Sequence, residues 1–376
     1  MAALAQYRLG CPKIVTPPET AHRSPRRSGS QPGSPPCYRP KQRMTHWKLT
    51  LAYDGTPFHG WQVQPSLPTV QGLLADAIHR TVGERVLPQG SGRTDAGVHA
   101  LAQVASFAIE APIPPANLHR ALNRCLPPSI RILSTEIVPS GFHARHSALR
   151  KTYEYRIFPL KPATEAGAPG LDSETWVHDP ICPPILAPYV WPCPWPLDLA
   201  ALNQAAAHVL GTHDFTTFAA TDPDLTTRTD SAAELGGPSS LSGSPKLGGP
   251  SFAAVSQRVG YSRPARTVLP DMEPVPHTSI RTITHSHWHA HDNLLIYRVT
   301  ATGFLHHMVR NLVGTFVQAG AHRLDPDSIP TLLAARNRAV AGPAAPASGL
   351  FLVNVEYPDL ADPTLTPDHL PLITHE

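Results

Sequence analysis

The sequence of 376 residues predicts an α+β fold: two split β-α-β units that share one broad antiparallel sheet, with helices on one side and a cleft between the units. Two observations predict this fold. Residues 45–146 alternate strand-like and helix-like patterns in the order β-α-β-β-α-β, and residues 147–360 repeat that order with longer loops. We therefore expect two halves of related architecture, separated near residue 146.

The apolar pattern defines each element of the first half. Trp47 to Tyr53 alternates between apolar and polar residues, as a half-buried strand does. From Val70 to Val82 the apolar residues recur at helical spacing, and Gly83 supplies a C-cap. The remaining elements expected here are strands over Arg85 to Gln89, Ala100 to Ile109 and Ile130 to Val138, and a helix within Pro115 to Cys125.

The second half is expected to contain four strands and three helices. The strands are Lys151 to Phe158, Ile280 to Thr284, Leu294 to Thr302 and Leu350 to Tyr357; the helices are Leu199 to Leu210, His306 to Ala319 and Pro330 to Asn337. We expect Gly211 to end the first of these helices. Three stretches break the pattern and are expected to be insertions: 159–196, rich in proline, 222–257, rich in Gly, Ser and Pro, and 275–292, rich in histidine.

The histidines of the third stretch are His277, His285, His287, His289 and His291. If this piece were a strand, histidines at every second residue would share one face and could chelate a metal. No cluster of cysteines or carboxylates accompanies them, so a solvated insertion is the interpretation that we favour, and we expect no metal site.

Charge is distributed unevenly along the chain. Residues 1–44 hold eight of the 31 lysines and arginines but one of the 28 acidic residues, so any RNA site in the remainder must be a local basic cluster. This Pro-, Ser- and Arg-rich stretch is expected to be a disordered tail or a misassigned start, and residues 361–376 a C-terminal tail. Five cysteines without a C-x-x-C pair, and no apolar run of about 20 residues, predict a cytoplasmic protein with no membrane span.

The most informative motif is Gly90-Ser91-Gly92-Arg93-Thr94-Asp95-Ala96-Gly97-Val98-His99, which sets one carboxylate in a glycine-rich loop between two strands. The glycines allow the main chain to press against a ligand and to point Asp95 into a cleft. Arg93, two residues earlier, is placed to pair with phosphate. From the residue types alone, an ordinary hairpin with a capping Asp explains the loop about equally well.

The whole motif closely resembles the signature of the tRNA pseudouridine synthase A family. Other motifs of that family follow in its order, between about Trp47 and Tyr357: Tyr53-Asp54-Gly55, Gly60-Trp61-Gln62, Phe142-His143-Ala144-Arg145, Tyr153 with Tyr155, Asp214-Phe215-Thr216, and Phe304-Leu305-His306-His307-Met308-Val309-Arg310-Asn311. The resemblance implies two ferredoxin-like halves with the active site between them. It also implies isomerisation of uridine to pseudouridine at positions 38, 39 and 40 of the tRNA anticodon stem-loop, and a homodimer.

The resemblance also implies a role for each candidate residue. Asp95 is the nucleophile, Arg310 is its ion-pair partner, and Tyr153 packs on the flipped base, although usage alone would favour a core position for a strand tyrosine. Arg93 holds a backbone phosphate or helps to flip the base. Arg145 and His143 contact RNA or support the cleft, and His306 and His307 have weaker claims.

Residue types and spacing agree with this chemistry. A carboxylate can attack a carbon centre covalently and leave again, and it stays ionised in a partly desolvated place when a cation lies beside it. The reaction has no net redox change and needs no energy input, so we expect no cofactor. Alternatives are a synthase acting on another RNA and a catalytically silent factor that binds or folds tRNA. A metallohydrolase built on the histidines would leave the Asp95 loop unexplained.

Overall fold

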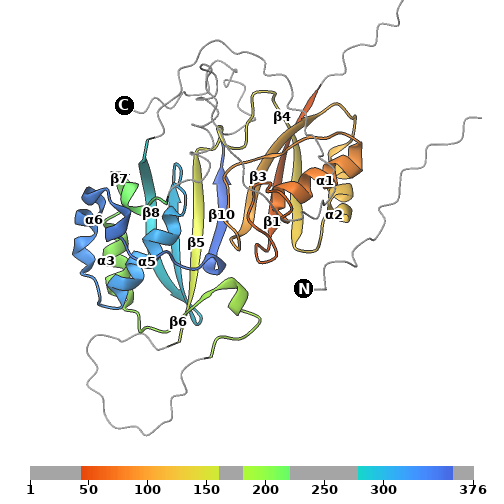
Figure 1. Cartoon of the computed structure of the whole chain (residues 1–376). Helices are drawn as coiled ribbons and strands as arrows, with labels where there is room; N and C mark the ends of the chain where they lie inside the picture. Colours follow the sequence, from red (N-terminus) through yellow and green to blue (C-terminus); the bar gives the residue numbers. More distant parts are fainter. Residues whose placement is uncertain (1–43, 161–180, 221–277, 359–376) are drawn as a thin grey trace, which may run out of the picture. The chain divides into compact units, whose positions relative to one another are not determined.

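The computed structural model describes residues 44–160, 181–220 and 278–358 (Figure 1). The expected insertion at 222–257, nearly all of the N-terminal stretch, and the C-terminal stretch lie outside these residues. All of the helices and strands in the described ranges belong to one compact unit. No helix in these ranges is both long and apolar enough to cross a membrane.

Ten strands form one sheet in the order β4-β1-β3-β10-β5-β9-β8-β7, with β2 paired to β3 and β6 paired to β5. The strands are β1 Thr45–Tyr53, β2 Gln89–Gly90, β3 His99–Ile109, β4 Ile130–Val138, β5 Arg150–Pro159, β6 Trp191–Cys193, β7 Gly211–Asp214, β8 Ile280–His291, β9 Leu294–Ala301 and β10 Leu350–Glu356. The sheet is mixed rather than antiparallel, because β10 runs parallel to β3 and β6 runs parallel to β5. The α+β class is confirmed.

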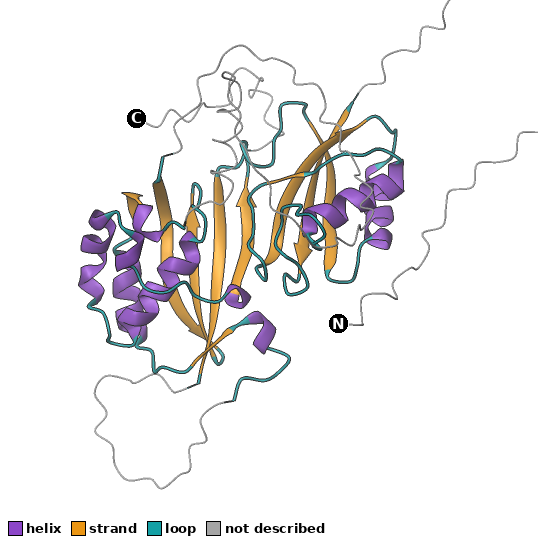
Figure 2. Cartoon of the chain, in the orientation of Figure 1, coloured by secondary structure: helices purple, strands orange, loops and turns teal. Residues whose placement is uncertain are grey.

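Within the described residues, five α-helices accompany the sheet: α1 Val70–Val82, α2 Pro115–Cys125, α3 Leu199–Ala207, α5 Met308–Gly320 and α6 Ile329–Ala335. Figure 2 shows them in two groups, α1 with α2 beside the first strands and α3, α5 and α6 beside β8. Cross-strand pairing puts Tyr53, Ala100, Leu352 and Tyr153 on one face of the sheet, since each is the partner of the next. That face carries the apolar core that both groups of helices cover.

Helix α1 shows why the first half was predictable. Thr69 has an extended backbone and its side chain accepts a hydrogen bond from Gly72 N, so it is the N-cap. Gly83, expected to be the C-cap, has φ 82° and donates its N–H to the carbonyl oxygen of His79. The two caps are local, but the first N–H groups of the helix, those of Val70 and Gln71, donate to the carbonyl oxygens of Gly60 and Trp61.

Three predictions about single elements are wrong. The strand expected over Arg85 to Gln89 is reduced to Gln89–Gly90. Helix α3 ends at Ala207, and Gly211, expected to terminate it, instead begins β7 with φ 96°. The strand expected over Ile280 to Thr284 continues to His291 as β8, paired with β7 and β9, so the described part of the histidine-rich stretch is mostly strand.

The pattern of β8 explains that last error. Ile283, Ser286 and Trp288 are buried, and a shift of register lies between Ile283 and His285. This irregularity breaks the simple alternation that sequence reasoning looks for. Beyond it, His285, His287 and His289 lie along one face, with neighbouring ring centroids 6.3 and 6.4 Å apart.

Candidate active site

The loop that carries Asp95 rests on the segment that follows β1. Trp61 N donates to the carbonyl oxygen of Thr94 at 3.0 Å. A Cβ on Gly60 would lie 2.6 Å from that oxygen, and Gly60 has φ 85°, so both the space and the backbone angle require glycine. The Gly60-Trp61-Gln62 motif is therefore the floor beneath the Asp95 loop.

Buried polar side chains fix the loop from inside the protein. The Tyr53 hydroxyl and Thr94 Oγ1 are 2.8 Å apart. Ser91 Oγ donates to Gln103 Oε1 at 2.6 Å, and Gln103 Nε2 donates to the Gly92 carbonyl oxygen at 2.9 Å. A buried network in which each member has a partner holds one conformation, so the Asp95 backbone is preorganised.

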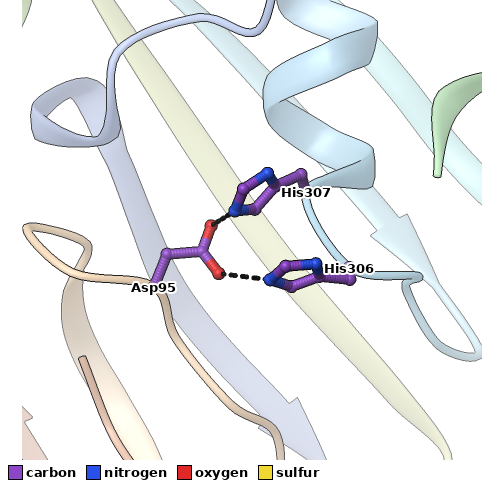
Figure 3. A group of neighbouring side chains, drawn as sticks. All are labelled: Asp95, His306 and His307. Atoms are coloured by element: carbon purple, nitrogen blue, oxygen red, sulfur yellow. Dashed lines mark ion pairs between the residues drawn. The ribbon is translucent and has the colours of Figure 1, made fainter. Parts of the chain in front are cut away.

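Three cationic or hydrogen-donating side chains from the second half surround the Asp95 carboxylate. Arg310 Nη1 lies 3.1 Å from Oδ2, His307 Nε2 lies 3.2 Å from Oδ2, and His306 Nε2 lies 3.5 Å from Oδ1. Figure 3 shows the two imidazoles pointing at the two carboxylate oxygens. Asp95 is partly buried, with 21% of its side chain exposed, so these contacts act with limited screening by solvent.

Arg310 is held on both sides by the chain that precedes β10. Its Nε donates to the Ala345 carbonyl oxygen at 2.8 Å, and Ala345 N donates to the Arg310 carbonyl oxygen at 3.0 Å. The guanidinium therefore has one edge on the backbone and one on Asp95. The ion pair with Asp95 that the resemblance implied is present.

The two histidines come from the start of α5, which has an unusual geometry. His307 is the N-cap residue and has φ 58°, in the left-handed region, and its side chain makes no capping hydrogen bond. For a residue with a Cβ this conformation costs about 1–2 kcal/mol. The rings of His306 and His307 stack with centroids 4.0 Å apart. The strained backbone thus delivers both imidazoles to Asp95.

The protonation of His307 follows from its surroundings. Burial lowers its pKa below the ordinary value, an effect that the Asp95 carboxylate partly offsets and that His306 and Arg310 reinforce. Near neutral pH the ring is therefore uncharged, and it can contact the carboxylate only by donating from a protonated Nε2. On the second ring, His306 Nδ1 is buried with no hydrogen-bond partner in the described part of the chain.

Tyr153 lies on β5, on the face of the sheet that the helices cover, and is 7% exposed. Its ring packs edge-on against Phe304 at a centroid distance of 5.0 Å. Burial raises the pKa of its hydroxyl above the ordinary value, and Tyr53 and Asp95 raise it further. The hydroxyl is therefore protonated at neutral pH, which favours a stacking role over one as a base.

Of the other three predicted residues, Arg93 belongs to the Asp95 loop itself, and His143 and Arg145 belong to the segment before β5. Arg93 is exposed, two residues from Asp95. Arg145 is exposed on the segment before β5, and its backbone N–H donates to His143 Nδ1 at 3.1 Å. His143 also accepts from His146 N, so its ring organises this turn. Burial lowers the pKa of His143, assisted by His146 and Arg145.

Asp95, His306 and His307 could also hold a metal ion, because their ligand atoms lie within 4.8 Å of one another. No other group of three such ligands occurs in the described ranges. The Arg310 guanidinium already contacts the same carboxylate, and its positive charge opposes a cation there.

Sequence reasoning missed two features of this site. His306 and His307 were given weaker claims than Arg310, yet all three contact Asp95. Lys151 was not considered, although it donates to the Ser91 carbonyl oxygen at 2.5 Å. Strand alternation could have found it, because Lys151 and Tyr153 are two residues apart and so share a face of β5.

The fold and the site define a class: an α+β protein in which one half of the sheet presents an aspartate to an arginine from the other half. Comparison with known proteins agrees. A family model described as tRNA pseudouridine synthase matches residues 50–147 and 270–358. A tRNA pseudouridine synthase A of Solibacter usitatus is 41% identical over 315 residues, which are 84% of this chain and 100% of that protein.

Two further relatives have the same name. The protein of Moorella thermoacetica is 38% identical over 312 residues, covering 82% of this chain and 98% of its own. The protein of Rhodopseudomonas palustris strain BisB5 is 36% identical over 317 residues, covering 84% and 100%. The chain therefore belongs to the tRNA pseudouridine synthase A family.

Proposed function

We propose that this protein isomerises uridine to pseudouridine in the anticodon stem-loop of tRNA, at positions 38, 39 and 40, with Asp95 as the nucleophile. The observation that carries the proposal is the carboxylate itself. It sits in a rigid loop, partly buried, and is paired with Arg310. Membership of the family supports the substrate class, and the contacts around Asp95 support the assignment of the residues.

The reaction breaks the bond between N1 of uracil and C1′ of ribose, turns the base, and forms a bond from C5 to C1′. The C5 proton is released and N1 gains a proton, so the atoms balance without a co-reactant. Three roles for Asp95 satisfy this scheme: attack at C1′, attack at C6, and removal of a ribose proton. All three require an ionised carboxylate, and Arg310 compensates its charge when water is excluded.

A uridine within a stem must leave its stack before it can react, which costs a few kcal/mol. In the proposal the base lies against Tyr153, whose ring Phe304 supports from its edge. Stacking of a base on an aromatic ring contributes about 1–3 kcal/mol, which is enough to offset much of that cost. Arg93, Arg145 and His143 lie near the loop and are assigned to the RNA strand on either side.

The family resemblance also supports a homodimer in which one tRNA lies across both subunits. The anticodon arm then enters one active site while the other subunit supports the body of the tRNA. Sedimentation of the purified protein at micromolar concentration tests this part separately: a fully active monomer would refute the dimer and leave the chemistry untouched.

The decisive experiment is the Asp95→Asn substitution, which keeps size and hydrogen bonding but removes the negative charge. We expect turnover to fall by several orders of magnitude, as for other essential nucleophiles. tRNA affinity should change little, because phosphate contacts supply most of it. Release of tritium from tRNA labelled at C5 of uridine measures turnover, and mapping of pseudouridine in an unmodified transcript gives its position.

Asp76→Asn is the matched control, because Asp76 is exposed on α1 and lies outside the loop that carries Asp95. It should leave turnover within twofold of the unaltered protein. Conversion by Asp95→Asn at a similar rate, in protein free of host synthase, would overturn the nucleophile. Pseudouridine only in a different RNA would overturn the substrate and keep the mechanism.

A further inference from the structure

Lys151 connects the strand that carries Tyr153 to the loop that carries Asp95. Its Nζ donates to the carbonyl oxygen of Ser91, and a Cβ on Gly92 would lie 3.4 Å from that Nζ. Residues two apart on a strand are about 6.6 Å apart and share a face. The distance from the Lys151 ammonium to the ring of Tyr153 is therefore about the length of one nucleotide.

Other cations gather at the same place. Arg281 lies against Gly303, since its Nε would be 3.5 Å from a Cβ there, and Gly303 precedes the Phe304 that supports Tyr153. In the sheet Lys151 pairs with Ala301, which pairs in turn with Ile283, two residues from Arg281 on β8. Arg145 precedes β5 in the chain and lies near enough to Lys151 and Arg281 to lower the pKa of both. Three positive side chains therefore meet next to the predicted position of the base.

Their mutual influence is visible in their ionisation. Burial, together with the charges of Arg145 and Arg281, lowers the pKa of Lys151 to about 8. Burial and Arg145 also lower the pKa of Arg281 below its usual range. Like charges that depress one another in this way disfavour folding, a cost that proteins commonly carry at sites where an anion binds.

No carboxylate in the described residues relieves this charge at Lys151 or Arg145. Neither side chain takes part in an ion pair within those ranges, whereas the nearby Asp95 is paired with Arg310. The Lys151 ammonium has three donors, and the Ser91 carbonyl uses one of them. The remaining donors and the exposed Arg145 guanidinium can serve an oxyanion that approaches from solvent.

We propose that Lys151 and Arg145, with Arg281 beside them, bind a backbone phosphate of the substrate RNA, in a linkage next to the nucleotide whose base lies on Tyr153. The inference rests on the proposed function. It adds a phosphate site on the sheet itself, separate from Arg93 in the loop. A phosphate bound there would accept a hydrogen bond from the same Lys151 ammonium that donates to the Asp95 loop. The RNA strand and the catalytic loop would therefore be positioned together.

The test is a binding cycle between protein and RNA variants. All proteins are full-length and carry Asp95→Asn, so that the RNA is not consumed. The RNA is an anticodon stem-loop in which one linkage, 5′ or 3′ of the target uridine, is a neutral methylphosphonate. We expect the neutral linkage at one of these positions to weaken binding roughly tenfold with the parent protein, as for loss of a charged hydrogen bond, but by less than twofold with Lys151→Gln.

Three further variants separate binding from folding. With Arg145→Gln the neutral linkage should likewise weaken binding by less than twofold. The Arg145 side chain is exposed, so this variant tests the proposal even if Lys151→Gln unfolds. Lys151→Arg should keep the coupling because it keeps the charge. Arg124→Gln, which removes an exposed charge from α2, should behave as the parent. The salt dependence of binding should fall by about 0.7–0.9 in log–log slope for Lys151→Gln.

The phosphate site would be overturned if the neutral linkage, at each of the two positions, weakened binding by the same factor in the parent protein, in Lys151→Gln and in Arg145→Gln. Turnover of the chain with Asp95 intact is measured on the same RNA. If pseudouridine forms but the effect of the neutral linkage does not depend on Lys151 or Arg145, this inference alone is refuted. If that dependence is found but no pseudouridine forms, the proposed function alone is refuted.

Discussion

Helices α1 and α5 have the same length, 13 residues each, but they begin in different ways. Helix α1 starts at Thr69, whose extended backbone and side-chain hydrogen bond cap the helix, while Val70 N and Gln71 N donate to the carbonyl oxygens of Gly60 and Trp61. Helix α5 starts at His307, which has a left-handed backbone and no side-chain cap. The imidazole that could have turned inward instead reaches Asp95, a residue of the other half.

The two helix starts differ in whether they stabilise the helix or place a side chain at the candidate site. A start built from neighbouring residues stabilises the helix and can be read from the sequence. A start that is strained and turned outward persists only when the surrounding structure over-determines it, and such strain clusters at functional sites. Substitutions at the start of α5 should therefore affect turnover first, and those at the start of α1 stability alone.

The largest expected effect comes from Arg310, in the first turns of α5. Arg310→Gln removes the charge beside Asp95 and should lower kcat by roughly 10²–10³-fold, the loss typical of a preorganised electrostatic partner. Arg310→Lys should recover only part of it, because lysine keeps the charge but cannot hold Ala345 and Asp95 together. Single-turnover kinetics measure both; a rate for Arg310→Gln within tenfold of the parent would contradict this role.

His307 allows strain and function to be separated. His307→Gly and His307→Ala both remove the imidazole, so each should lower turnover by a similar factor, roughly tenfold. Only glycine adopts φ 58° without cost, so the glycine variant should be more stable than the alanine variant by about 1 kcal/mol. Urea unfolding measures the difference, and equal stabilities would show that the backbone is not strained.

At α1, the Thr69→Ala substitution removes the N-cap and should lower the free energy of unfolding by about 1 kcal/mol. kcat under native conditions should stay within twofold of the parent, because the cap does not contact Asp95. A loss of turnover similar to that of the His307 variants, in a fully folded sample, would remove the distinction between the two helices.

The smallest expected effect is on the pH dependence of stability. Burial holds the folded-state pKa of His307 below its unfolded value, so between those values the unfolded chain binds more protons. The stability contributed by a neutral His307 is therefore present above about pH 6.5 and is lost as the pH falls towards the folded-state pKa. From pH 7 to pH 5, His307→Gly should lose less unfolding free energy than the parent; parallel losses would show that His307 does not titrate in this range.

Sequence periodicity predicted the parts of the fold that local chemistry determines. Helix α1, with its cap at Gly83, has the expected bounds, since spacing and capping agree there. Gly211 misled because glycine after a helical pattern suggests a C-cap, whereas its positive φ here opens β7. The part of strand β8 after Thr284 was missed because histidines occupy the outer face, while Ile283 and Trp288 lie inward across an irregular register.

In the candidate site too, the parts that local motifs determine were predicted, and the parts that tertiary contacts determine were not. The Asp95 loop and the Arg310 pair came from motifs that the resemblance supplied, and the ion pair is present. The contacts of His306 and His307 depend on a left-handed residue, which no periodicity reveals. The cluster around Lys151 depends on which strands lie side by side, because β5, β9 and β8 are distant in sequence order from the loop that they support.

The position of strand β10 in the sheet determines when the two halves can join during synthesis of the chain. It follows every other described strand in the chain, yet it lies between β3 and β5 and joins the two halves. Domains generally fold from the N-terminal end as the ribosome delivers them, so the first half can form early, with Asp95 in its loop. Ala345, which holds Arg310, and β10 emerge later. A nascent chain therefore carries Asp95 before the backbone group that holds Arg310 beside it has been made, so the complete ion-pair arrangement forms only when the last strand is in place.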